Sequence, residues 1–217
     1  MTKVKLTLIN NSSVKLILSQ FTDPDSYVTL QTKVLSLPFV VMAIQLPSSS
    51  SSSSSLSNDF TYDVFISFRG TDTRFGFTGH LYKALSDKGF HTFIDDKDLP
   101  GGDEITPSLW KSIEDSRIAI IVFSKNYATS SFCLDELVHI IHYFKAKGRL
   151  VLPIFYDVEP SQVRHQNDYY GEALAKHEEG FQNNKENMER LLKWKKALNQ
   201  AANLSGHHFN LGYPSSF

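Results

Sequence analysis

One carboxylate stands at a position where a catalytic site could use it. Glu136 belongs to segment 133–137, which reads CLDEL, in the first turns of a helix predicted to begin near Ser130 or Ser131. The helix dipole stabilises a carboxylate at that end. The apolar stretch 118–123 before it is typical of a central strand, whose carboxyl end faces a ligand crevice. A lone helical Glu is also typical of solvated surface, so both interpretations stay open at this point.

A second polar group follows the first predicted strand, 64–68. Glycine there lets a ligand approach the backbone, and arginine can bind a phosphate through two parallel hydrogen bonds. The alternative is an ordinary polar loop. The candidate binding residues are Phe68, Arg69, Gly70, Thr71 and Asp72.

Acidic residues follow the second predicted strand, 91–94, in segment 95–104, which reads DDKDLPGGDE. An acidic pair in this place could hold magnesium in a phospho-receiver domain. That function needs an acceptor aspartate at the end of the third strand, and the chain has Ser124 and Lys125 there instead. The sequence therefore argues against a phospho-receiver.

Composition excludes several other classes. The 217 residues carry a formal net charge of −1, which gives no basic excess for nucleic-acid binding. The one cysteine, Cys133, forms no intrachain disulfide and fits a reducing compartment. His and Cys show no zinc-ligand spacing, so no metal site is expected. No apolar run reaches the ~18 residues of a membrane span.

From Tyr62 onward, strand and helix patterns alternate. This alternation predicts an α/β fold with a parallel sheet of about five strands and helices on both faces. The expected strands are 64–68, 91–94, 118–123, 150–156 and a short one within 206–211. The expected helices are one through Phe77 and Leu85 that ends at Gly89, then 105–113, one from Ser130 or Ser131 to Gly148, and 188–204. Pro160 is expected to open an irregular stretch.

Residues 1–58 differ from the rest and end in the serine run 48–55, which has nothing to bury and is interpreted as a flexible tether. We hypothesise that native translation starts at Met42, just before this run. A genuine N-terminal extension and an organellar transit segment are the alternatives. N-terminal sequencing of the native protein would decide among them.

Several segments in order resemble the plant Toll/interleukin-1 receptor (TIR) domain. They are 62–70 (YDVFISFRG), 67–74 (SFRGTDTR), 93–96 (FIDD), 118–124 (IAIIVFS) and 131–137 (SFCLDEL). The resemblance covers about residues 61–211 and implies the flavodoxin-like TIR fold. We assign 59–211 to this domain and 212–217 to a tail.

The resemblance implies an activity, in which Glu136 cleaves NAD⁺ between nicotinamide and ribose. It also implies that the loop of Phe68–Asp72 and the loop 95–104, with Asp95 and Asp103, contact this substrate, and that no further cofactor is needed. Nicotinamide in NAD⁺ is already a cationic leaving group and needs no general acid, so one carboxylate can stabilise the ribosyl cation. ADP-ribose and a cyclic isomer remain open as products, as do NAD⁺ and NADP⁺ as substrates.

The resemblance also implies partners. TIR domains self-associate, which is expected here through the helix of His80, the final helix and loop 95–104, with other TIR immune receptors as further partners in plant defence signalling. Neither nucleic acid nor membrane is expected. The expected compartment is the cytoplasm, with the nucleus as an alternative. The chain has no P-loop motif, which fits a TIR-only protein or a truncated receptor.

Three residues depart from the family pattern. Gly79 stands where Ser is frequent, Gly101 where Arg is frequent, and Phe132 where Trp is usual. They keep open a second interpretation, a non-catalytic adaptor that signals by binding other TIR domains. A third, nuclease-like or cyclic-nucleotide synthase activity, has no support from the near-neutral charge.

Overall fold

The computed structural model describes residues 60–94, 107–182 and 184–209. The serine-rich region 1–58, the start at Met42 and the tail 212–217 lie outside these residues, and those predictions stay predictions. Loop 95–104, with Asp95, Gly101 and Asp103, also lies outside them.

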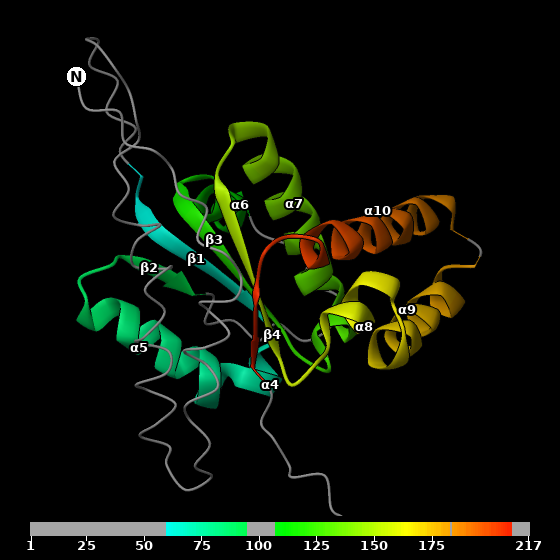
Figure 1. Ribbon diagram of the computed structural model, residues 1–217. Coiled ribbons are helices and arrows are strands. Elements are labelled where there is room, and N and C mark those ends of the chain that lie inside the picture. The colour runs from blue at the N-terminus through cyan, green and yellow to red at the C-terminus, as the bar shows by residue number, and fades with distance from the viewer. Residues whose placement is uncertain (1–59, 95–106, 183, 210–217) are drawn as a thin grey trace, which may run out of the picture.

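The centre of the molecule is a five-stranded sheet in the order β2-β1-β3-β4-β5 (Figure 1). Every neighbouring pair is parallel. The strands are β1 Tyr62–Phe68, β2 Thr92–Ile94, β3 Ser116–Phe123, β4 Leu150–Tyr156 and β5 His207–Phe209. The predicted flavodoxin-like α/β fold is confirmed. Its strand order places the topological switch point between β1 and β3, where such sheets bind ligands beyond the strands' carboxyl ends.

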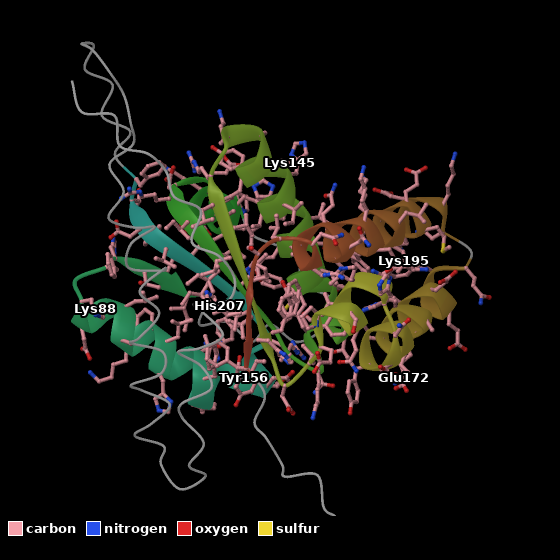
Figure 2. The ribbon with its side chains drawn as sticks, viewed as in Figure 1. Lys88, Lys145, Tyr156, Glu172, Lys195 and His207 are labelled. Atoms are coloured by element: carbon pink, nitrogen blue, oxygen red, sulfur yellow. The ribbon has the colours of Figure 1, made fainter. Side chains whose placement is uncertain are left out.

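Helices cover both faces of the sheet, as predicted. Alternate residues of each strand point to opposite faces, so β3 sends Ile120 to one apolar cluster and Ile121 to the other. The first face packs against α5, while the second packs against α6, α7, α9 and α10 (Figure 1). Figure 2 shows Lys88 at the end of α5 on one side of the sheet and Lys195 of α10 on the other.

The helices follow the strands in regular alternation. They are α4 Gly70–Thr73, the π-helical turn η1 Arg74–Thr78, α5 Gly79–Asp87, α6 Pro107–Glu114, the 3₁₀ turn η2 Tyr127–Thr129, α7 Ser131–Lys147, α8 Pro160–His165, α9 Asp168–Phe181 and α10 Lys185–Ala202. Gly89 and Gly148 take left-handed backbone angles, with φ of 84° and 62°. They end α5 and α7 as the sequence predicts.

The stretch after Pro160 is not irregular, and this prediction is wrong. Pro160 is the first residue of α8, whose capping box joins Glu159 and Gln162. Proline is favoured at this position because its missing N–H would have no partner there anyway. Helix α9 then covers η2 and packs Tyr170 and Leu174 into the core.

The predicted helix through Phe77 and Leu85 is divided between η1, which contains Phe77, and α5, which contains Leu85. The chain turns directly from β1 into α4 and reaches α5 through η1, with a kink at Gly76. The final helix, predicted from residue 188, begins at Lys185. The Asn184 side chain caps it by accepting a hydrogen bond from the Asn187 backbone N–H.

Within the described residues, no helix is long and apolar enough to cross a membrane. The same residues contain no group of three or more His, Cys, Asp or Glu that could hold a metal ion.

Candidate active site

Glu136 lies inside the protein, at the carboxyl end of the sheet. The Ser130 side chain caps α7 by accepting a hydrogen bond from the Cys133 N–H, so the helix starts at Ser131 and Glu136 falls in its second turn. Among the described residues, Glu136 is the one acidic or basic residue in the buried interior, with 3% of its surface exposed. Burying a carboxylate is costly unless partners compensate it. The structure thus contradicts the solvated-surface interpretation.

One hydrogen-bond partner of Glu136 comes from the switch-point strand β1. Ser67 of β1 donates a hydrogen bond from Oγ to Oε2 of Glu136 at 2.7 Å. The hydroxyl oxygen of Tyr127, in η2, lies 2.9 Å from the same Oγ. The Tyr127 hydroxyl also donates to the Cys133 carbonyl oxygen at 3.1 Å. Residues from β1, η2 and α7 therefore meet around one buried carboxylate.

The charge of Glu136 acts on its neighbours. Burial raises the pKa of the Cys133 thiol to about 12, the Glu136 carboxylate adds to that rise, and the Arg69 guanidinium opposes it. Burial also raises the pKa of Tyr127 well above its ordinary value, and electrostatic interactions with Cys133 and Glu136 act in the same direction. Both groups stay neutral at physiological pH, so the Tyr127 hydroxyl remains a hydrogen-bond donor.

The first turns of α7 are also held from the other side, by α10. Asp135, next to Glu136 in the chain, accepts hydrogen bonds from the Arg190 guanidinium and, at 2.7 Å, from the Trp194 indole N–H. The Arg190 guanidinium lies over the Trp194 ring, 4.9 Å from its centroid. Trp194 itself is fully buried. This contact fixes the rotation of α7 between the sheet and α10.

Arg69 follows β1 directly and is half-buried. Its Nε atom is buried and has no hydrogen-bond partner among the described residues. Buried donors normally find partners. An anionic ligand such as a phosphate would provide one, because a guanidinium binds phosphate through charge-assisted hydrogen bonds.

Asp72 of α4 joins two loops at this edge of the sheet. Its Oδ2 accepts hydrogen bonds from the Ser124 hydroxyl at 2.6 Å and the Asn126 backbone N–H at 2.9 Å. Its Oδ1 accepts another from the Asn126 side chain at 3.1 Å. The turn after β1 is thereby tied to the segment after β3. These contacts give Asp72 a structural role at the site.

The remaining candidates of this loop differ in exposure. Phe68 is buried, and the Arg74 guanidinium lies 5.0 Å from its ring centroid. Gly70 is buried in the first position of α4, whereas Thr71 is exposed. The structure thus brings Phe68, Arg69 and Asp72 to the edge where Glu136 lies.

The family follows from sequence comparison. A model of the TIR domain matches residues 61–216. The chain belongs to the TIR domain family.

Relatives with this domain are plant proteins. The chain is 52% identical to "Disease resistance protein RPV1" of Vitis rotundifolia over 161 residues, which cover 74% of this chain and 11% of that protein. It is 51% identical to "TMV resistance protein N" of Nicotiana glutinosa over 154 residues, which cover 71% of this chain and 13% of that protein. The chain thus spans only about a tenth of the length of these relatives.

A solved structure has the same fold. The TIR domains of the activated Roq1 resistosome, which directly recognizes the pathogen effector XopQ, share 49% sequence identity with this chain at a TM-score of 0.63. The match covers 68% of this chain and 87% of that chain.

Two of the three departures from the family pattern lie on described helices of this TIR domain. Phe132 is partly buried and packs against the main apolar cluster. Gly79 opens α5, where a Cβ atom would lie 2.5 Å from the Arg74 carbonyl oxygen. The backbone of this TIR domain therefore has no room for the frequent Ser at 79. His80, beside it, is partly exposed, and its α5 lies across the sheet from α10 (Figure 1).

Sequence reasoning did not single out Ser67, Tyr127 or the Asp135–Arg190 contact as parts of the site. Ser67 gives one signal, because it is a polar residue inside the apolar run of β1. Tyr127 follows the last residue of β3 by four positions and carries no motif. Only the fold brings it to Ser67.

Proposed function

We propose that this TIR domain hydrolyses NAD⁺, with Glu136 as the catalytic carboxylate. The observation that carries the proposal is a buried, hydroxyl-bonded carboxylate beside the topological switch point. Strongly desolvated acidic groups in such crevices are typical of active sites. Family membership and the position of Glu136 in its CLDEL segment support the same conclusion.

In this proposal, the bond between C1′ of the ribose and the nicotinamide nitrogen breaks, and its electron pair leaves with nicotinamide and cancels the ring charge. The negative charge of Glu136 stabilises the ribosyl cation that develops. Water then attacks C1′ and releases one proton, which gives ADP-ribose. Attack by an adenine nitrogen would instead give a cyclic isomer.

Arg69 is the proposed phosphate contact, because its buried Nε needs a hydrogen-bond acceptor. Phe68, Gly70 and Thr71 are proposed to line the approach to it. Asp72 takes part by holding this turn against Ser124 and Asn126. Asp95 and Asp103 remain proposed substrate contacts of a loop outside the described residues. NAD⁺ is a substrate here, and no further cofactor is proposed.

We further propose that activity requires self-association in plant defence signalling, in the cytoplasm. The similar TIR domains of Roq1 belong to a resistosome. Large apolar side chains are exposed on or next to the helices proposed to make contacts. Phe75, in η1 just before α5, is 97% exposed, and Leu192 on α10 is 63% exposed. Exposed apolar groups favour association in water.

The test is nicotinamide release from NAD⁺ by the purified chain, at high concentration with a crowding agent. We expect release by wild type, near-complete loss in Glu136→Ala, and wild-type rates in Glu172→Ala. Glu172 is an exposed residue of α9 and serves as the matched control (Figure 2). Equal release by wild type and Glu136→Ala would contradict the proposal. No release by wild type, together with self-association seen by light scattering, would favour the adaptor function instead.

A further inference from the structure

Two hydroxyl groups and the carboxyl group of the proposed catalytic residue form a continuous series of buried hydrogen-bonding groups. Tyr127, Ser67 and Glu136 are 0%, 1% and 3% exposed. The links are the 2.9 Å contact between the two hydroxyl groups and the 2.7 Å hydrogen bond to Oε2 of Glu136. The three residues come from η2, β1 and α7, so these hydrogen bonds connect three elements at one point.

The direction of the hydrogen bonds follows from counting protons. An ionised Glu136 accepts hydrogen bonds and donates none, so the single hydroxyl hydrogen of Ser67 is directed to it. The contact between Ser67 and Tyr127 then has Tyr127 as its donor. The Tyr127 hydrogen is shared with the Cys133 carbonyl oxygen, its other acceptor. Each donor in such a series polarises the next toward the anion.

The burial of Ser67 and Tyr127 also bears on their role. Ser67 interrupts a run of buried apolar residues in β1, and an apolar residue there would carry no desolvation cost. Because burial keeps Tyr127 neutral up to high pH, its hydroxyl remains a donor under all physiological conditions. The arrangement suits a carboxylate held in a fixed orientation.

We propose that Ser67 and Tyr127 are positioning residues for Glu136 and form a hydroxyl relay that orients its carboxylate for NAD⁺ cleavage. This inference rests on the proposed function for its kinetic effect, but the relay itself can be tested without substrate. Ser67 acts directly on the carboxylate, and Tyr127 acts through Ser67.

The kinetic test uses Ser67→Ala and Tyr127→Phe with two matched controls. Ser116 is an equally buried strand serine, but it lies at the opposite end of the sheet and donates to Ser112. Tyr170 is an equally buried tyrosine whose hydroxyl donates to the Ser124 carbonyl oxygen. The controls are Ser116→Ala and Tyr170→Phe.

We expect Ser67→Ala to lower kcat by about tenfold or more with KM changed by less than about twofold, the pattern of a lost transition-state interaction. Tyr127→Phe should lower kcat by a smaller factor, about threefold, because it acts one link away. The two controls should keep kcat within about twofold of wild type. Unchanged kcat in Ser67→Ala, while wild type is active, would overturn the positioning role.

The second readout is denaturant unfolding in a double-mutant cycle. Ser67→Ala in wild type removes one hydrogen-bond donor from a buried carboxylate, whereas in Glu136→Ala that carboxylate is absent. Ser67→Ala should raise the equilibrium constant for unfolding in both backgrounds. The factor of this rise should be at least about fivefold larger in wild type than in Glu136→Ala. The same cycle with Ser116→Ala should be additive. An additive Ser67 cycle would overturn the relay, even if wild type cleaved no NAD⁺ and the proposed function itself failed.

Discussion

At the scale of single residues, the surroundings of Glu136 compensate part of the cost of burying its carboxyl group. Ser67 gives it a hydrogen bond, and the first turns of α7 lie at the positive end of the helix dipole. The uncharged Cys133 and Tyr127 beside it keep their protons because burial and the nearby negative charge disfavour their ionised forms. Two neutral groups, the Cys133 thiol and the Tyr127 hydroxyl, therefore lie beside the Glu136 carboxylate.

The buried thiol gives a residue-scale prediction. Cys133 is 4% exposed, and burial raises its pKa to about 12. Since the thiolate is the reactive form, a disulfide reagent at pH 8 should label the native protein at least about a hundredfold more slowly than the urea-unfolded protein. The chain has one cysteine, so the absorbance change reports this thiol alone. Native labelling within a few-fold of the unfolded rate would show that the thiol beside Glu136 is accessible.

At the scale of elements, α7 is clamped between two neighbours. Its inner face packs on the sheet, and Asp135 joins it to Arg190 and Trp194 of α10. Glu136 and Asp135 point in different directions because neighbouring helix residues are about 100° apart. One turn of α7 therefore directs the Glu136 carboxylate to the site and the Asp135 carboxylate to α10.

The start of α5 gives an element-scale prediction. Gly79→Ser, which restores the residue frequent in the family, would bring a Cβ atom to 2.5 Å from the Arg74 carbonyl oxygen. The backbone must shift to relieve this contact, so we expect a loss of about 1–3 kcal/mol in unfolding free energy. Gly180→Ser in α9 is the control, since a Cβ atom there meets nothing within 4 Å. Equal stability of Gly79→Ser and wild type would mean that η1 repacks without cost.

Much of this architecture is predictable from sequence, and the failures have physical reasons. The apolar β-branched run of β3 and the helix-ending Gly148 predict their elements correctly because local pattern decides them. Pro160 suggested an irregular stretch, although the capping box of Glu159 and Gln162 makes it a helix start. The candidate site contains one residue that a sequence motif indicates, Glu136. Its hydroxyl partners are not indicated in this way, because Tyr127 lies sixty positions from Ser67 along the chain.

At the scale of the whole molecule, the strand order determines where chemistry can occur. The chain leaves β1 toward α5 on one face and leaves β3 toward α7 on the other, which opens the edge between them. Ser67, Arg69, Asp72 and Glu136 all lie at that edge. The match to TIR domains of a resistosome and the exposed Leu192 of α10 support assembly as the next level of organisation.

Acid stability gives a prediction at this scale. Burial lowers the pKa of His139, His177 and His207 below the ordinary value of 6.5. Below that pH the unfolded chain binds protons that the folded protein does not, so stability falls as pH falls. The urea midpoint should therefore be lower at pH 5.5 than at pH 7.5.

Two variants make this test specific. His177→Gln should reduce the loss of stability at acid pH, because it removes one of the three partly buried imidazoles. His165→Gln, at an exposed position of α8, should leave the loss of stability at acid pH unchanged. A midpoint independent of pH in wild type would contradict the burial of these side chains.

NAD⁺ cleavage, as we propose it, depends on the negative charge of the Glu136 side chain, and the decisive variant is Glu136→Gln. This variant keeps the size of the side chain and an oxygen that can accept from Ser67, and it removes the charge. We predict that assembled wild type releases nicotinamide and that Glu136→Gln, assembled to the same extent by light scattering, releases it at least about a hundredfold more slowly. Nicotinamide release by Glu136→Gln at the wild-type rate would show that the charge of Glu136 is not needed for cleavage.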